Sequence, residues 1–110
     1  MTRFLWRSLA VAAALPCVAV AQDRVSPESF LDFAVGKTLT FEVFPNGNLV
    51  GFEEYLRRDL SVWRDRSDIC GYGRVTVEDN LICFLYDNDR EGVPVCWATF
   101  RDNNRWFVMS

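Results

Sequence analysis

The stretch Ile82–Trp97, ICFLYDNDREGVPVCW, contains two apolar runs separated by an acidic segment with one glycine. Apolar runs on either side of Asp, Asn and Gly predict a β-hairpin. Facing residues of an antiparallel hairpin have a constant index sum, so a turn centred between Asp89 and Arg90 places Cys83 opposite Cys96. Facing Cα atoms lie ~4.5–5.5 Å apart, within the range that a disulfide spans. We therefore expect a Cys83–Cys96 disulfide.

Three cysteines follow residue 21, and this pairing leaves the thiol of Cys70 over. Its pairing with Cys83 or Cys96 is the alternative connectivity, because spacing alone does not determine which cysteines pair. Without such a pairing Cys70 is free, and no C-x-x-C motif accompanies it to indicate a thioredoxin-like function.

Both faces of the predicted hairpin are apolar, because alternate residues of a strand point to opposite sides. One face has Ile82, Phe84, Tyr86, Val95 and Trp97, and the other has Leu81, Cys83, Leu85, Cys96, Ala98 and Phe100. A sheet that is apolar on both sides requires cover on both sides. We expect the interior of a bent sheet on one side and a helix on the other, with a dimer interface or a bound apolar ligand as the alternatives.

The rest of the chain predicts one helix and an antiparallel meander. Ser26-Pro27-Glu28 is a typical helix start, and apolar residues then recur at helical spacing until Gly36. From residue 38 the apolar period changes to two. The predicted strands are residues 38–43, a partner after Asn46-Gly47, 60–64, 74–78, 81–86, 93–100 and 105–109, with 65–73 as a loop or bulge. The fold class is α+β, mostly β: a short N-terminal helix packed on about seven strands in a bent sheet or small barrel.

The Asn46-Gly47 turn also predicts a register. If these two residues form the loop, Phe41 faces Phe52 and Val43 faces Val50, with both pairs on one apolar face.

The first 21 residues are expected to be a secretory signal peptide cleaved after Ala21. Arg3 and Arg7 precede a short apolar run that ends in Ala19-Val20-Ala21. The run is short for a membrane span, which needs ~20 residues; a lipoprotein signal at Cys17 is the minor alternative. Residues 22–110 then form a single small domain in the periplasm or outside the cell. Without Arg3 and Arg7, ten basic residues remain against fifteen acidic ones, a net charge of −5 that disfavours nucleic acid as a partner.

The chain contains no histidine, which removes the usual general base and the commonest zinc ligand. The segment Asp87–Gly92 resembles the first half of a calcium loop, but position twelve is Ala98 in place of a glutamate. Glu53 and Glu54 are adjacent and point to opposite faces of a strand, so they do not form a carboxylate pair for glycoside hydrolysis. We expect no catalytic residue, cofactor or metal, and a carboxylate- or thiol-based enzyme is the least favoured alternative.

Aromatic residues are frequent and fall mostly at positions predicted to face inward. A filled core explains most of them. Trp63, Trp97 and Trp106 are also candidates for a pocket lining. A ligand cavity, if present, is expected to be lined by Phe41, Phe52, Phe84 and Trp97.

Several short motifs resemble a known group. They are Gly51-Phe52-Glu53-Glu54-Tyr55, Val62-Trp63, Cys70-Gly71-Tyr72-Gly73, Ile82-Cys83-Phe84-Leu85-Tyr86 and Cys96-Trp97. From Gly36 to the C-terminus the chain is similar to small exported alphaproteobacterial proteins of a domain-of-unknown-function group with a C-x-x-G, C-F-x-Y and C-W series. Relatives often have tryptophan where this chain has Arg74. The resemblance implies a periplasmic β-rich domain with structural cysteines and no known activity.

Together these features favour a non-enzymatic periplasmic binding or interaction module. Its expected partner is an envelope protein that contacts aromatic and arginine side chains. A lipocalin-like carrier of a small apolar ligand is the alternative.

Overall fold

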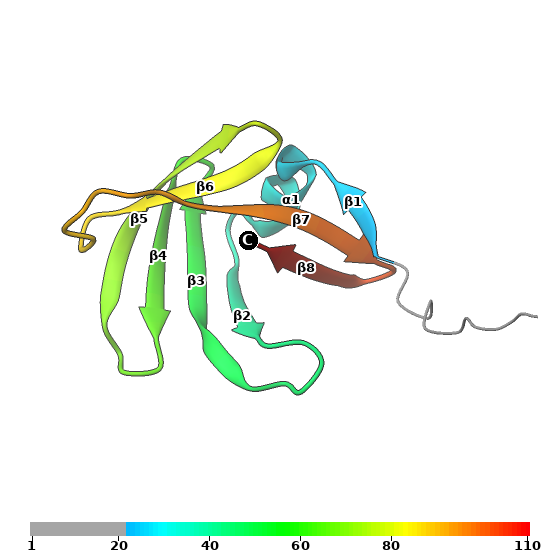
Figure 1. Ribbon diagram of the computed structural model, residues 1–110, viewed down its shortest axis with the longest axis horizontal. Helices are drawn as coiled ribbons and strands as arrows, with labels where there is room; N and C mark the ends of the chain where they lie inside the picture. The colour runs from blue at the N-terminus through cyan, green and yellow to red at the C-terminus, as the bar shows by residue number, and fades with distance from the viewer. Residues whose placement is uncertain (1–21) are drawn as a thin grey trace, which may run out of the picture.

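The computed structural model describes residues 22–110, so the expected signal peptide and its cleavage site lie outside the described residues. These residues contain one short helix and eight strands (Figure 1). The elements are β1 (Asp23–Val25), α1 (Pro27–Ala34), β2 (Thr38–Glu42), β3 (Leu49–Arg57), β4 (Leu60–Asp65), β5 (Cys70–Glu78), β6 (Leu81–Tyr86), β7 (Val95–Asp102) and β8 (Arg105–Met109).

The strands form one antiparallel sheet that curls into a half-barrel (Figure 1). From β2 to β8 each strand pairs with the next along the chain, as expected for a meander. The first part of β7 pairs with β6, and Thr99 in its second part pairs with Val25 of β1 and Val108 of β8. The predicted fold class is confirmed, and the three-residue β1 is an additional strand that the sequence analysis did not predict.

Helix α1 begins as its sequence predicts, but it covers a different face of the sheet. Ser26 is the N-cap, its Oγ accepts a hydrogen bond from the Ser29 amide, and Pro27 occupies the first turn. Phe30 packs edge-on against Tyr55 of β3 and Trp106 of β8, with ring centroids 5.7 Å apart in both pairs. The helix therefore joins the inner face of the sheet, and the expectation that it covers the opposite face is wrong.

A single core lies between α1 and the inner face. Its buried residues are Phe30, Leu31, Ala34, Tyr55, Val75, Ile82 and Phe84. Within residues 22–110 nothing covers the outer face to the same extent: Tyr72 exposes 55% and Leu85 41% of its surface.

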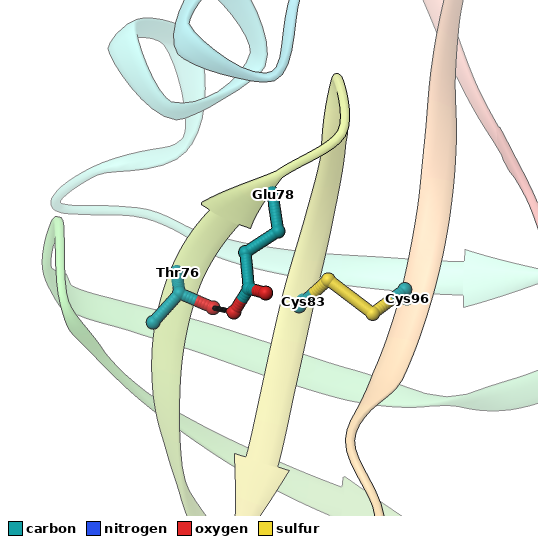
Figure 2. Close-up of a disulfide and its surroundings, with 4 residues drawn as sticks. All are labelled: Thr76, Glu78, Cys83 and Cys96. Carbon is teal, nitrogen blue, oxygen red and sulfur yellow. Dashed lines mark hydrogen bonds between the residues drawn. A yellow bond between two sulfur atoms is a disulfide. The ribbon is translucent and has the colours of Figure 1, made fainter.

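The disulfide joins Cys83 of β6 to Cys96 of β7, as predicted (Figure 2). The two residues are register partners with Cα atoms 4.0 Å apart, and Cys83 is buried. Their neighbour across β5 is Thr76, on the face opposite Ile82 and Phe84. Cys70 is free and exposed, so the alternative connectivities are excluded.

The extents of two predicted strands are wrong: β7 is Val95–Asp102 and not 93–100, and β5 begins at Cys70 and not at Arg74. Residues 70–73 belong to β5 and not to a loop, because the tight turn forms earlier, where Asp65 accepts hydrogen bonds from the Ser67 and Ile69 amides. Glycine is expected to mark a loop, yet here Gly71 and Gly73 lie inside a strand.

The predicted β2–β3 register is shifted by one residue. Phe41 pairs with Gly51 and Thr40 pairs with Phe52, so Phe41 and Phe52 point to opposite faces. The connection is longer than a two-residue turn: the Val43 amide donates to the Asn48 carbonyl, and the Gly47 amide donates to the Val43 carbonyl. A bulge follows between Phe41 and Glu42.

Candidate binding site at the open seam of the sheet

The curled sheet does not close, because β2 pairs only with β3 and β8 pairs only with β7 among the described strands. We call the gap between β2 and β8 the seam. Side chains meet across it without a backbone ladder: the rings of Phe44 and Phe107 lie 5.0 Å apart, edge to face. The Arg105 guanidinium lies 5.3 Å from the Phe44 ring centroid and 5.2 Å from that of Phe107.

Three open hollows of about 380, 300 and 350 Å³ follow the seam and share lining residues. The first lies between β2 and β8 and reaches Phe30 of the helix. The second lies beside the β2–β3 connection and Arg105. The third lies toward β7 and is lined by Phe41, Glu42, Val50, Val95, Trp97, Val108 and Ser110.

The rim of the seam is strongly apolar. Val43, Phe44, Val50, Val95 and Met109 each expose between 39% and 58% of their surface, and all five line the hollows. Isolated exposed apolar residues are common on soluble proteins, but a contiguous patch beside a hollow is typical of an interaction site. The seam is therefore the candidate binding site.

The charged groups at the seam are few and exposed. Glu42 lines all three hollows and Arg105 lines the second. Neither forms an ion pair with another residue in the range 22–110. Both charges are consequently available to a partner.

The predicted ligand pocket is only partly assembled. The Phe41 and Trp97 rings lie 5.7 Å apart and line the third hollow, whereas Phe84 is buried behind Trp97, with ring centroids 6.3 Å apart. Phe52 points to the outer face, where the Arg64 guanidinium lies 4.4 Å from its ring centroid. The register shift in β2–β3 is the reason that these four side chains do not line one cavity.

Of the three tryptophans considered as pocket lining, Trp97 and Trp106 line the seam hollows. Trp63 instead lies over Gly51, where a Cβ atom would approach its ring to 2.5 Å. Phe44, Phe107 and Met109 also line the first hollow and were not among the residues predicted from the sequence. The alternation of apolar and polar residues in β8 predicts which face of the sheet each residue occupies. It does not predict that β2 lies across the seam from β8.

A second notable cluster surrounds Glu53, which is 3% exposed on the inner face. Ser61 Oγ donates a hydrogen bond of 2.6 Å to Glu53 Oε2, and the Tyr86 hydroxyl donates one of 2.8 Å to Oε1. Burial raises the pKa of Glu53 to about 7, although the two hydroxyl donors act in the opposite direction. Burial and the nearby Glu53 raise the pKa of Tyr55 and of Tyr86.

Gly73 makes this cluster possible. It pairs with Tyr86 and with Ser61, and a Cβ atom there would lie 2.8 Å from the Tyr86 ring and 2.9 Å from Ser61 Oγ. Because Gly73 has no side chain, the Tyr86 ring can occupy this space, and its hydroxyl donates to Glu53. Glu53 lines none of the hollows described above, so its carboxyl group has no access to a substrate there.

The remaining sequence candidates lie apart from the seam. Cys70 lines a shallow outer hollow with Phe52 and Arg64. The segment Asp87–Gly92 connects β6 to β7, and residues 22–110 contain no group of three or more acidic or cysteine side chains that could hold a metal ion. No helix in this part of the chain is long and apolar enough to span a membrane.

Comparisons with known proteins add no relative: no protein-family model, no curated protein and no solved structure matches the chain. The resemblance to the exported alphaproteobacterial group therefore stays a prediction from short motifs.

Proposed function

We propose that the protein is a non-enzymatic binding module that holds an apolar segment of a partner protein in the seam between β2 and β8. One observation carries the proposal: exposed apolar side chains and three hollows that share lining residues coincide with the place where the sheet does not close. An envelope protein is the partner that fits an exported domain.

Export to the periplasm or beyond is part of the same proposal. The Cys83–Cys96 disulfide supports it, because disulfides persist in oxidising compartments and small domains benefit most from them. The expected leader at residues 1–21 is a second, independent support from the sequence.

A carrier of a small apolar ligand is the second candidate. It is favoured by the third hollow, whose volume of about 350 Å³ is at the low end of the ~300–1,000 Å³ typical of ligand pockets. Against it, the interior behind Phe41 and Trp97 is occupied by Phe84, Tyr86 and the Glu53 cluster, which leaves the hollows open and shallow.

Site-specific photocrosslinking tests the first candidate. A photoreactive phenylalanine derivative replaces Phe44 or Met109 at the seam, and Tyr72 on the outer face serves as the matched control, because all three side chains are about half exposed. We expect the same protein to be crosslinked in the cell envelope from positions 44 and 109 and not from position 72. Phe107→Asp is expected to abolish this product.

Equal crosslinking from all three positions, or none from the seam, contradicts the proposal. Native mass spectrometry of the protein purified from cells separates the second candidate from the first. Extra mass that is released on denaturation and lost in Trp97→Ala indicates a small ligand.

A further inference from the structure

The free edge of β2 has the hydrogen-bonding groups that an additional strand needs. The Tyr55 amide donates to the Lys37 carbonyl, and the Val43 amide donates to the Asn48 carbonyl. Backbone groups of an antiparallel strand point alternately toward its partner and away from it. The backbone amides and carbonyls of the odd-numbered residues in β2 therefore point toward β3. Those of Thr38, Thr40 and Glu42 point away from it.

The central residues of this edge, 38–41, lack the features that usually protect edge strands from pairing, and charged residues occur only beside them, at Lys37 and Glu42. Proline, inward-pointing charge and bulges in the strand centre are the common protections. Residues 38–41 are Thr-Leu-Thr-Phe, with no proline and no charge, and the bulge comes only after Phe41.

The surface next to the edge suits side chains that alternate along an extended peptide. Thr40 lines both the first and the second hollow, so the free backbone groups and the apolar walls belong to the same site. Phe44 and Phe107 supply aromatic contacts beside it, and Arg105 has no carboxylate partner within residues 22–110.

We propose that the seam recognises an extended polypeptide segment by strand addition to the free edge of β2, with apolar residues at alternate positions and a carboxylate for Arg105. The inference rests on the proposed function and specifies its partner: a backbone with free amides and carbonyls distinguishes a polypeptide from an apolar small molecule. Main-chain hydrogen bonds then provide affinity and the hollows provide selectivity.

Defined peptides test the inference. The probes are acetylated, amidated heptapeptides of the pattern Lys-Φ-Thr-Φ-Thr-Φ-Glu, in which Φ is Val, Leu or Phe. Each binding peptide is remade in two forms, with methyl groups on the amide nitrogens of either set of alternate residues. Methylation on the pairing edge is expected to weaken binding by about tenfold or more, and methylation on the other edge is expected to leave it unchanged.

Two measurements on the protein locate the contact. Hydrogen exchange of the Thr40 and Glu42 amides is expected to slow when a peptide binds, because these groups become hydrogen-bonded. Thr40→Pro removes the outward amide without removing a bond to β3 and is expected to abolish binding, while Thr40→Val serves as the matched control. Near-ultraviolet circular dichroism checks that both variants fold, and the methylated peptides test the inference on the unaltered protein.

Three outcomes overturn the inference, and they differ in what they mean for the proposed function. Binding that protects neither amide and ignores the methylation pattern shows an apolar groove without strand addition, and the proposed function stands. Failure of every peptide to bind also refutes strand addition, and the crosslinking from positions 44 and 109 then decides the proposed function by itself. Protection of Thr40 that increases with protein concentration in the absence of peptide identifies a second copy as the occupant.

Discussion

Glu53 has a buried carboxyl group whose raised pKa makes stability depend on pH near neutrality. Its carboxyl group is buried between Ser61 and Tyr86, and burial raises its pKa from 4.5 to about 7. Between these values the folded protein keeps a proton that the unfolded chain has released, so raising the pH favours the unfolded state. Below about pH 4.5 both states are protonated, and above about pH 7 both are ionised.

We expect the free energy of unfolding to fall by about 3 kcal/mol from about pH 5 to about pH 8, because each pKa unit corresponds to ~1.4 kcal/mol. Urea unfolding across this range measures the change. Glu53→Gln is expected to remove most of the slope and to be more stable than the unaltered protein at about pH 8. Glu54→Gln, on the exposed side of the same strand, is the control.

A slope that survives Glu53→Gln would assign the pH dependence to another group. Asp59 does not account for it. Its hydrogen bond with Arg57 lowers the pKa of this carboxyl below 3.8, so the stability it contributes is lost only in more acidic solution.

The β6–β7 hairpin combines a short ladder with a covalent crosslink. Only three register pairs join β6 to β7, and the disulfide connects the middle one (Figure 2). Its loop spans a sequence separation of 13 residues. A closed loop of ~15 residues corresponds to about 3 kcal/mol of lost entropy in the unfolded chain.

Removing the crosslink with Cys83→Ala and Cys96→Ala together is expected to lower the free energy of unfolding by about 3 kcal/mol. Guanidinium unfolding with and without a reductant measures this, and the reductant is expected to have no effect on the double variant. Cys70→Ser is the control, because Cys70 is free and exposed and its replacement is expected to change stability by less than ~0.5 kcal/mol. A double variant as stable as the parent would show that the strand ladder alone holds the hairpin.

In the half-barrel as a whole, β2 and β8 do not pair at the seam, and helix α1 contacts strands on both sides of it. Phe30 contacts Tyr55 of β3 and Trp106 of β8, so one helical side chain joins two distant parts of the sheet. Phe33, one turn further, stacks on Trp106 with ring centroids 4.9 Å apart but is only partly buried. The two residues provide a matched pair for testing how the helix supports the fold.

Phe30→Ala is expected to destabilise the protein by about 3–5 kcal/mol, because it leaves a cavity among Tyr55, Trp106 and the helix. Phe33→Ala is expected to cost about 1–2 kcal/mol, because its ring is not fully removed from water. Chemical denaturation measures both values, and tryptophan fluorescence reports the contact with Trp106. Equal losses would mean that the helix is anchored through Trp106 and not through the link to β3.

Local patterns in the sequence were sufficient for the elements whose signals lie close together in the chain. Spacing, alternation and turn chemistry predicted the Ser26-Pro27 helix start, the strands at 60–64, 81–86 and 105–109, and the Cys83–Cys96 pairing, and the structure confirms them. The predicted β2–β3 register was wrong because the connection between these strands is longer than a two-residue turn. The predicted extent of β5 was wrong because its glycines were taken to mark a loop. They leave room for the Tyr86 ring and the Asn88 side chain, and these neighbours come together only in the folded sheet.

The sequence by itself determined the fold class and the absence of histidine chemistry, and it predicted the Cys83–Cys96 disulfide, since each depends on composition or on residues within one hairpin. The structure then excluded the other cysteine pairings. The seam and the Glu53 cluster were decided only by the tertiary structure. Phe44 meets Phe107, and Glu53 meets Tyr86, across separations in sequence that no local period describes. The curvature of the sheet brings these residues together, and it arises from the summed twist, bulge and packing of all its strands.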